Sequence, residues 1–249
     1  MHAVVREVPD SFVSALAETP RRISLTKARR QHARYVEALR AAGAEVIAIP
    51  ADEAHPDCPF VEDQAVVLGS RALIARAGHP SRQGEAGPVA AVLAERGLEL
   101  VPMPEPATLD GGDVLLVGGT LYVGRSRRTN GEGIAALART FDVPVVPVPV
   151  AGLHLKSVAS AASDRLVLVA AGTVDPALFD GCDVVVVPPD EAAAANVVAV
   201  GRTVLLLAGH PVTREALEDR RLDVVELGAS EFRKADGSLT CLSILVATE

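Results

Sequence analysis

Alternating apolar and polar segments repeat at least four times along the 249-residue chain. Each copy consists of an apolar strand, a tight polar or glycine-containing turn, a second apolar strand and a stretch with helical character. The first strands are expected at 60–68, 112–117, 155–160 and 195–200, and the second strands at 72–76, 121–123, 166–170 and 204–208. Helical segments are expected after residue 85, at 130–141, near residue 176 and at 213–220. The turns recur every 37 to 49 residues, a period of one supersecondary unit.

A fifth unit requires both ends of the chain. The apolar runs 3–5 and 240–247 could supply its two strands together, and their pairing would close the array and cover its open sheet edges. No linker divides the chain, and 102–106 is expected to be an extended surface loop. We therefore predict an α/β fold with fivefold pseudo-symmetry in one domain, residues 1–249. An ordinary α/β sandwich with similar hairpins is the alternative.

Composition narrows the class of protein. Apolar residues make up 49% of the chain and charged residues 22%, as in globular proteins. The formal charge of −8 argues against general attraction to nucleic acid or anionic lipid, and no apolar run approaches the ~20 residues that span a bilayer. The N-terminus lacks a signal-peptide pattern, and three cysteines do not form a disulfide framework. These features predict a cytoplasmic protein without nucleic-acid or membrane partners.

Polar residues concentrate where the repeated units begin. They are Asp57, Glu62, Asp63, Asp110, Asp113, His154, Lys156 and, near the chain end, Cys241. A closed array would bring them together, so that a thiol, an imidazole and several carboxylates converge. A cationic substrate suits the carboxylates and favours the nucleophilic thiolate, and the combination therefore points to attack on a guanidinium carbon. The alternative is that Cys241 and His154 are buried structural residues.

Other motifs are absent or weaker. No phosphate-binding glycine motif and no paired metal-ligand spacing occur, which disfavours a nucleotide enzyme and a structural zinc site. Cys58 and Cys182 are expected to be core or surface thiols. Arg82 and Arg128 would by default be solvated, but each follows the second strand of a unit, and this equivalent placement suits clamping of one carboxylate.

Seven strings, in order along nearly the whole chain, resemble one known family. They are VPDSF (8–12), PDCPFVED (56–63), LDGGDVL (109–115), RRTN (127–130), LHLKS (153–157), AAN (194–196) and KADGSLTC (234–241). Each string is weak alone, but together they are highly specific. The chain resembles the dimethylarginine dimethylaminohydrolases of the guanidino-group-modifying (pentein) superfamily, a resemblance that implies a five-module α/β propeller.

The resemblance implies catalytic roles at matching positions. Cys241 would be the nucleophile and His154 the general acid and base. Asp110 would orient His154 and contact the guanidinium, which Asp63 would bind from the other side with support from Glu62. Some family members have Glu where Asp110 stands, a difference of one methylene in reach but not in charge.

The resemblance also implies how the amino-acid end of the substrate is held. Arg82 and Arg128 would hold the α-carboxylate. Asp57 would receive the α-amino group, together with the backbone carbonyls of Leu16 and Ala235. Ala235 replaces a larger aliphatic residue, which matters little if its carbonyl makes the contact.

The implied activity is hydrolysis of Nω-methylated arginine to citrulline and methylamine or dimethylamine through a covalent intermediate on Cys241, without metal or organic cofactor. Arginine deiminase chemistry is the alternative within enzymes, although deiminases of this superfamily usually carry an inserted helical domain. A non-catalytic arginine-binding module is the alternative of another class, and the retained Cys241 speaks against it. The expected partner is a small cationic amino acid, and assembly into a homodimer is an alternative to a monomer. The segment 15–27 is expected to form a mobile flap beside the pocket.

Overall fold

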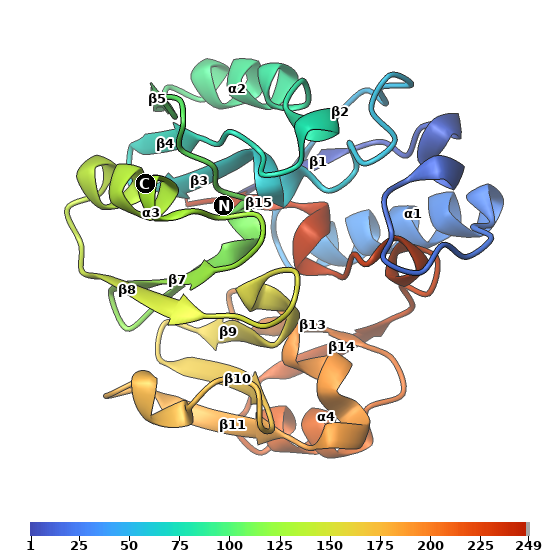
Figure 1. The fold of residues 1–249 in the computed structure, drawn as a ribbon. Coiled ribbons are helices and arrows are strands. Elements are labelled where there is room, and N and C mark those ends of the chain that lie inside the picture. Colours follow the sequence, from blue (N-terminus) through green and yellow to red (C-terminus); the bar gives the residue numbers. More distant parts are fainter. Residues whose placement is uncertain (248–249) are drawn as a thin grey trace.

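Five similar modules follow one another around a ring in the computed structural model, which describes residues 1–247 (Figure 1). Each module in this range contains a three-stranded sheet, and the strand orders are β15-β1-β2, β3-β4-β5, β6-β7-β8, β9-β10-β11 and β12-β13-β14. In every sheet the middle strand pairs antiparallel with one neighbour and parallel with the other. The predicted five-module α/β propeller is therefore confirmed.

Hairpins form the first two strands of four modules, as the repeat predicted. They are β3 (Ala65–Leu68) with β4 (Arg71–Ile74), β6 (Val114–Val117) with β7 (Thr120–Arg125), β9 (Ala159–Ser163) with β10 (Leu166–Ala170), and β12 (Val198–Val200) with β13 (Thr203–Leu207). The turn between β6 and β7 uses Gly118 and Gly119 at positive φ values of 60° and 75°, which glycine adopts without steric strain.

All four predicted first strands begin too early. Residues at the start of 60–68, 112–117, 155–160 and 195–200 instead belong to 3₁₀ helices, which are η2 (Val61–Gln64), η4 (Gly111–Asp113), η5 (Leu155–Ser157) and η7 (Pro189–Ala195). A single turn of 3₁₀ helix is too short to show a period of its own, so its apolar residues merge with those of the strand that follows.

A third strand, absent from the predicted repeat, completes each module. The third strands are β2 (Glu45–Ile49), β5 (Glu99–Pro102), β8 (Val145–Pro149), β11 (Asp183–Val187) and β14 (Asp223–Leu227). Each is an edge strand of its sheet. Edge strands tolerate proline, as β5 and β8 show, and their partial exposure weakens the alternation that would have revealed them.

Helices lie on the outside of the ring, between the second and third strands of four modules (Figure 1). They are α1 (Leu25–Ala41), α2 (Ala86–Glu95), α3 (Gly131–Thr140) and α4 (Pro211–Glu218). The remaining module has the 3₁₀ helix η6 (Pro176–Leu178) at this place. Helix α1 begins inside the segment expected to be a flap, which limits the loop to 15–24, after η1 (Asp10–Ser14).

The two ends of the chain close the ring, as predicted. Strand β1 (His2–Arg6) pairs antiparallel with β15 (Ile244–Val246) and parallel with β2. In the β1–β15 pair, Val4 lies opposite Ile244. The module that contains the N-terminus is therefore completed by residues from the opposite end of the chain.

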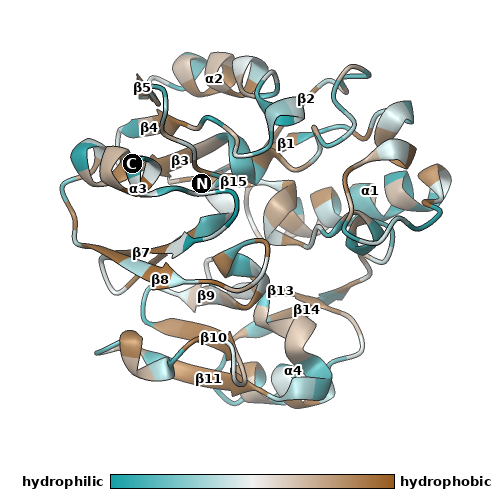
Figure 2. Ribbon diagram, viewed as in Figure 1, coloured by the Kyte–Doolittle hydropathy of each residue, from teal (hydrophilic) through white to brown (hydrophobic). Residues whose placement is uncertain are grey.

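Apolar side chains fill the space between the sheets and the helices, and the strands β10 and β11 are the most continuously hydrophobic in Figure 2. On the α1 side, Tyr35 and Leu39 are buried in one cluster with Phe12 and Phe232. The hydroxyl of Tyr35 lies 2.7 Å from Oγ of Ser243, a hydrogen bond that fixes the helix to the chain just before β15. Within the described residues, none of the helices is both long enough and apolar enough to cross a membrane.

Candidate active site

Five short 3₁₀ helices, one before the first strand of each module, meet near the centre of the ring. They are η2, η4, η5, η7 (Pro189–Ala195) and η9 (Thr240–Leu242). Helix η2 contacts η9 and η4, η4 contacts η5, and η5 contacts η7. The polar residues predicted to converge lie on or beside these turns, so ring closure gathers side chains that are far apart in the sequence.

A pocket of about 350 Å³ lies beside these turns. Eight of the ten predicted site residues line it, namely Leu16, Asp57, Asp63, Arg82, Arg128, His154, Ala235 and Cys241. Asp110 is fully buried behind His154, to which it is hydrogen-bonded. Glu62 lines a second cavity, of about 770 Å³, that contains no other predicted site residue among its lining.

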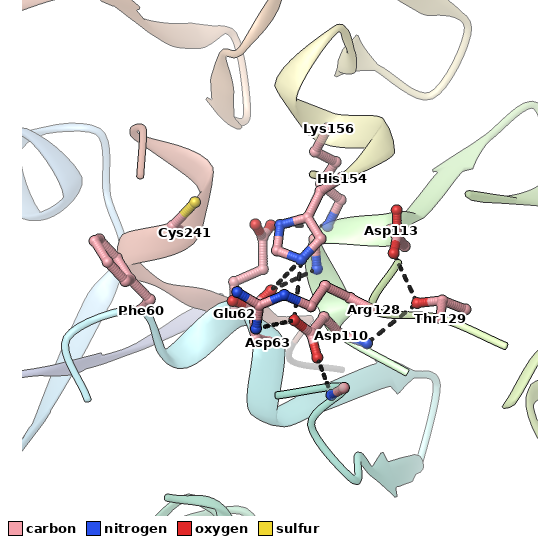
Figure 3. A network of polar contacts seen from close by, with 12 residues as sticks. Phe60, Glu62, Asp63, Asp110, Asp113, Arg128, Thr129, His154, Lys156 and Cys241 are labelled. Carbon is pink, nitrogen blue, oxygen red and sulfur yellow. Dashed lines mark hydrogen bonds and ion pairs between the residues drawn. The ribbon is translucent and has the colours of Figure 1, made fainter. Parts of the chain in front are cut away.

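His154 faces two carboxylates (Figure 3). Its Nε2 atom lies 3.0 Å from Oδ2 of Asp110 and 4.0 Å from Oδ1 of Asp63. Burial by itself would lower the pKa of His154, but the charge of Asp63 and the hydrogen bond that the ring donates to Asp110 raise it to about 9. The imidazole is therefore protonated at neutral pH, an ordinary state for a general acid.

Backbone geometry leaves room for this cluster only because residue 112 is glycine. A Cβ atom at Gly112 would lie 2.7 Å from Nδ1 of His154 and 2.9 Å from Oδ1 of Asp63. The N–H group of Gly112 donates a 3.0 Å hydrogen bond to the same oxygen of Asp63. Gly112, the second glycine of the string LDGGDVL (109–115), thus permits a close approach of the backbone to the imidazole.

Arg82 holds Asp63 from the side opposite His154. Its Nη1 atom donates to Oδ2 of Asp63 at 2.6 Å, and its Nε and Nη2 atoms donate to the carboxylate of Glu85. Burial opposes ionisation of Asp63, but the charges of His154 and Arg82 lower its pKa to about 2. Most donors of Arg82 are thus used within the protein, and its expected role toward a substrate carboxylate stays a prediction.

Arg128 lines the pocket and has a buried donor that makes no hydrogen bond within the described residues. Its Nη1 atom lies 3.6 Å from Oδ2 of Asp110 and has no hydrogen-bond partner among the described residues. The side chain is mostly buried, so an unpartnered donor is costly unless a ligand satisfies it. Arg128 is therefore well placed to bind an anionic group.

Asp57 connects the pocket to the loop at 15–24. Both of its carboxylate oxygens accept from the N–H group of Leu16, at 3.1 and 3.3 Å. Burial raises the pKa of Asp57, although the charge of Arg82 opposes the rise. On the same loop, the N–H group of Glu18 donates to Asp236, and the Glu18 carboxylate pairs with Arg127.

Cys241 lies on η9, and its Sγ atom accepts a 3.4 Å hydrogen bond from the N–H group of Ser238. Burial raises the pKa of the thiol, and the charges of Glu62 and Asp63 raise it further, to about 12. The cysteine of the free protein is therefore a neutral thiol at neutral pH.

A second network, whose contacts the sequence did not indicate, joins Thr240, the neighbour of Cys241, to Glu62 and Lys156 at the lining of the larger cavity. Glu62 accepts from Nζ of Lys156 at 2.7 Å and from Oγ1 of Thr240 at 2.8 Å. Asn196 donates to the carbonyl of Lys156 and to Oγ1 of Thr240, and accepts from the Thr240 N–H group. The strings at 153–157, 194–196 and 234–241 contained these residues, but nothing local in them indicated their contacts.

Asp63, Asp110 and His154 are also a set of potential metal ligands, since one donor atom from each lies within 4.8 Å of the others. Each of these side chains already has partners in the protein: Asp63 binds Arg82, and Asp110 accepts from the N–H group of Gly78 at 2.8 Å. A metal ion would have to displace the proton that His154 holds up to a pKa of about 9. The cluster suits an organic cation better than a metal ion.

Known proteins of similar sequence and structure include several members of one family. A family model described as "N,N dimethylarginine dimethylhydrolase, eukaryotic" matches residues 6–203. The N(G),N(G)-dimethylarginine dimethylaminohydrolase of Streptomyces coelicolor is 42% identical over 217 residues, which are 84% of this chain and 82% of that protein. A solved structure from Pseudomonas aeruginosa, a cysteine-to-serine mutant of the enzyme complexed with citrulline, is 31% identical, covers 98% of both chains and has a TM-score of 0.92.

Proposed function

Because the chain belongs to the dimethylarginine dimethylaminohydrolase family, we propose that it hydrolyses Nω-methylated arginine to citrulline and methylamine or dimethylamine. The observation that carries the proposal is the grouping of one thiol, one protonated imidazole and the carboxylate of Asp63 at a single pocket, with Asp110 bonded to the imidazole from behind. A guanidinium group is planar and cationic, so Asp63 can hold it by charge-assisted hydrogen bonds while Asp110 adds negative charge behind His154. Citrulline, the product, is the molecule bound in the relative from Pseudomonas aeruginosa.

The first half of the reaction forms a covalent bond to Cys241. Arrival of a cationic guanidinium beside the thiol offsets the charges of Glu62 and Asp63, which raise its pKa in the free protein. The thiol proton leaves to solvent, the resulting thiolate attacks the guanidinium carbon to form a tetrahedral adduct, and His154 gives its proton to the departing methylamine or dimethylamine as the C–N bond breaks. The carbon is left bonded to Sγ as a thiouronium.

The second half of the reaction releases citrulline. His154, now neutral, removes a proton from a water molecule that attacks the same carbon. The bond to Sγ then breaks as the carbonyl group of citrulline forms, and the remaining hydroxyl proton is released and restores the thiol. Asp110 keeps the imidazole in one orientation in both steps through the 3.0 Å contact to Nε2. No metal or organic cofactor takes part in this scheme.

The amino-acid end of the substrate is held by other residues of the same pocket. Arg128, with its unpartnered Nη1 atom, binds the α-carboxylate, and Arg82 assists it. Asp57 and the carbonyl oxygens of Leu16 and Ala235 receive the α-amino group. Glu62 does not line this pocket, and it acts through its negative charge, which raises the pKa of Cys241.

Three wider expectations belong to the proposal. Residues 1–249 act as one catalytic domain, the substrate is a small cationic amino acid, and the enzyme works in the cytoplasm. A homodimer is compatible with them.

The test is citrulline formation by the purified protein, with asymmetric dimethylarginine, monomethylarginine and arginine supplied in parallel. Turnover of the methylated substrates that disappears in Cys241→Ser supports the proposal. Turnover of arginine alone would assign a deiminase. Binding of these amino acids without turnover would assign an arginine-binding module.

A further inference from the structure

Asp113 is a buried carboxylate that the proposed reaction does not use. It lies at the end of η4, is 0% exposed, and is not part of the described lining of the pocket. Its oxygens nevertheless accept three hydrogen bonds from two segments that carry proposed site residues, the turn at 126–129 and the chain beside His154. Figure 3 shows the bond from Thr129. We propose that Asp113 is a positioning residue that fixes His154, Asp110 and Arg128 relative to one another, an inference that rests on the proposed function.

The first hydrogen bond holds the backbone beside the imidazole. Oδ1 of Asp113 accepts from the N–H group of Leu155 at 2.9 Å. Leu155 directly follows His154, whose extended backbone precedes η5 without a side-chain cap of its own. The Asp113 carboxylate therefore takes the place of that cap and fixes where the imidazole leaves the backbone.

The second hydrogen bond reaches Asp110 through a threonine. Oδ2 of Asp113 accepts from the hydroxyl of Thr129 at 2.7 Å, and the Oγ1 atom of Thr129 accepts from the N–H group of Asp110 at 3.3 Å. Thr129 thus transmits the position of one carboxylate to the backbone of the residue that contacts His154.

The third hydrogen bond reaches the segment of Arg128 through a serine. Oδ2 of Asp113 accepts from the hydroxyl of Ser126 at 2.6 Å. The Oγ atom of Ser126 in turn accepts from the N–H groups of Arg128 at 3.0 Å and Thr129 at 3.2 Å. The turn that carries the Arg128 guanidinium is therefore anchored to the same carboxylate.

The surroundings of Asp113 fit a carboxylate, with a close backbone neighbour on one side and three donors around its oxygens. A Cβ atom at Gly124 would lie 2.3 Å from Oδ1 of Asp113, so only glycine allows β7 to pass this close. The Asp113 side chain is the acceptor in all three of these hydrogen bonds, as an ionised carboxylate, which cannot donate, must be. An amide at this position would turn its NH₂ group toward the Ser126 and Thr129 hydroxyls, which would then have to rotate away.

The two hydroxyl branches predict different kinetic effects, which a merely structural role would not produce. Ser126→Ala loosens the Arg128 segment, so we expect KM for dimethylarginine to rise about tenfold with kcat little changed. Thr129→Val loosens Asp110, so we expect kcat to fall about tenfold and the pKa of His154 to fall, with KM little changed. Thr129→Ser keeps the hydroxyl and should restore wild-type values, and Asp113→Asn should show both effects.

The matched control is Thr140→Val, which removes another buried threonine hydroxyl, bonded to the carbonyl of Ala136 in α3. It should leave kcat, KM and the pKa of His154 unchanged. Kinetics are normalised to the folded fraction, and the pKa of His154 is measured by NMR in the substrate-free protein. Failure of wild-type turnover would refute the proposed function alone, because the NMR titration still reports on Asp113 and Thr129. Wild-type values in folded Thr129→Val and Asp113→Asn, or equal effects of both branches on kcat and KM, would overturn the positioning role.

Discussion

Oδ2 of Asp110 and Nε2 of His154 lie 3.0 Å apart where water is almost excluded, since Asp110 is 0% exposed and His154 is 5% exposed. In such surroundings a charge-assisted hydrogen bond is stronger than in water. The contact therefore fixes the ring and favours its protonated form at the same time.

Asp110→Asn should lower the pKa of His154 from about 9, because the substitution removes a negative charge and a hydrogen-bond acceptor that both raise it. We expect a fall of about one unit or more and at least a hundredfold lower kcat, measured by NMR titration and steady-state kinetics. Asp223→Asn, on the exposed start of β14, is the control. An unchanged titration of His154 in folded Asp110→Asn would contradict this account.

The stability of the protein should fall as the pH rises above neutrality. The pKa of His154 is about 9 in the folded protein and 6.5 without its partners, so its stabilising contribution is fully present below pH 6.5 and is lost as the pH rises through 9. The difference corresponds to about 3 kcal/mol. Denaturant unfolding at pH 6 and pH 9 should show a smaller decrease in His154→Gln than in the wild type, and equal decreases would be evidence against a raised pKa.

Glu62→Gln should make Cys241 more acidic. Burial is the largest cause of the raised thiol pKa, and the charge of Glu62 is the next. We expect the pKa to fall from about 12 by about one unit or more, measured as the pH dependence of alkylation in a Cys182→Ser background that removes the half-buried surface thiol. Glu99→Gln, on exposed β5, should have no effect, and the idea fails if the two variants titrate alike.

Gly112→Ala should abolish most activity while the protein stays folded. The added methyl group would come within 2.7 Å of the His154 ring and within 2.9 Å of Asp63, so the imidazole has to shift. We expect at least a hundredfold loss of kcat, because small displacements of catalytic groups are costly. Gly87→Ala, in α2 with nothing within 4 Å of the new methyl group, is the matched control. Near-normal kcat in Gly112→Ala would show that the ring has more freedom than the structure indicates.

The sequence pattern predicted the hairpins, which recur in four of the modules, and the closure of the ring. Gly118 and Gly119 between apolar runs predicted a hairpin correctly, and the runs that became β1 and β15 predicted ring closure. The third strands were missed because they are partly exposed edge strands, and in β8 two prolines interrupt the alternation further.

Site residues with distinctive chemistry could be predicted from the sequence, whereas residues whose role depends on their contacts in the folded protein could not. A thiol, an imidazole and paired carboxylates are unusual enough to be singled out, and Cys241, His154 and Asp63 do line one pocket. Thr129 and Ser126 carry no such signal, because hydroxyl residues in loops are common and their partner Asp113 is set by the packing of η4 against β7. For the same reason the sequence could not show that Arg82 is paired with Asp63 and Glu85.

Pairing of β1 with β15 joins two segments that lie far apart in the sequence, and such contacts form slowly because a long loop has to close first. Cys241 lies just ahead of β15, on the same stretch of chain. The proposed nucleophile therefore joins the pocket of Asp63 and His154 through a long-range contact, and a folding intermediate in which β15 is unpaired is expected to lack activity.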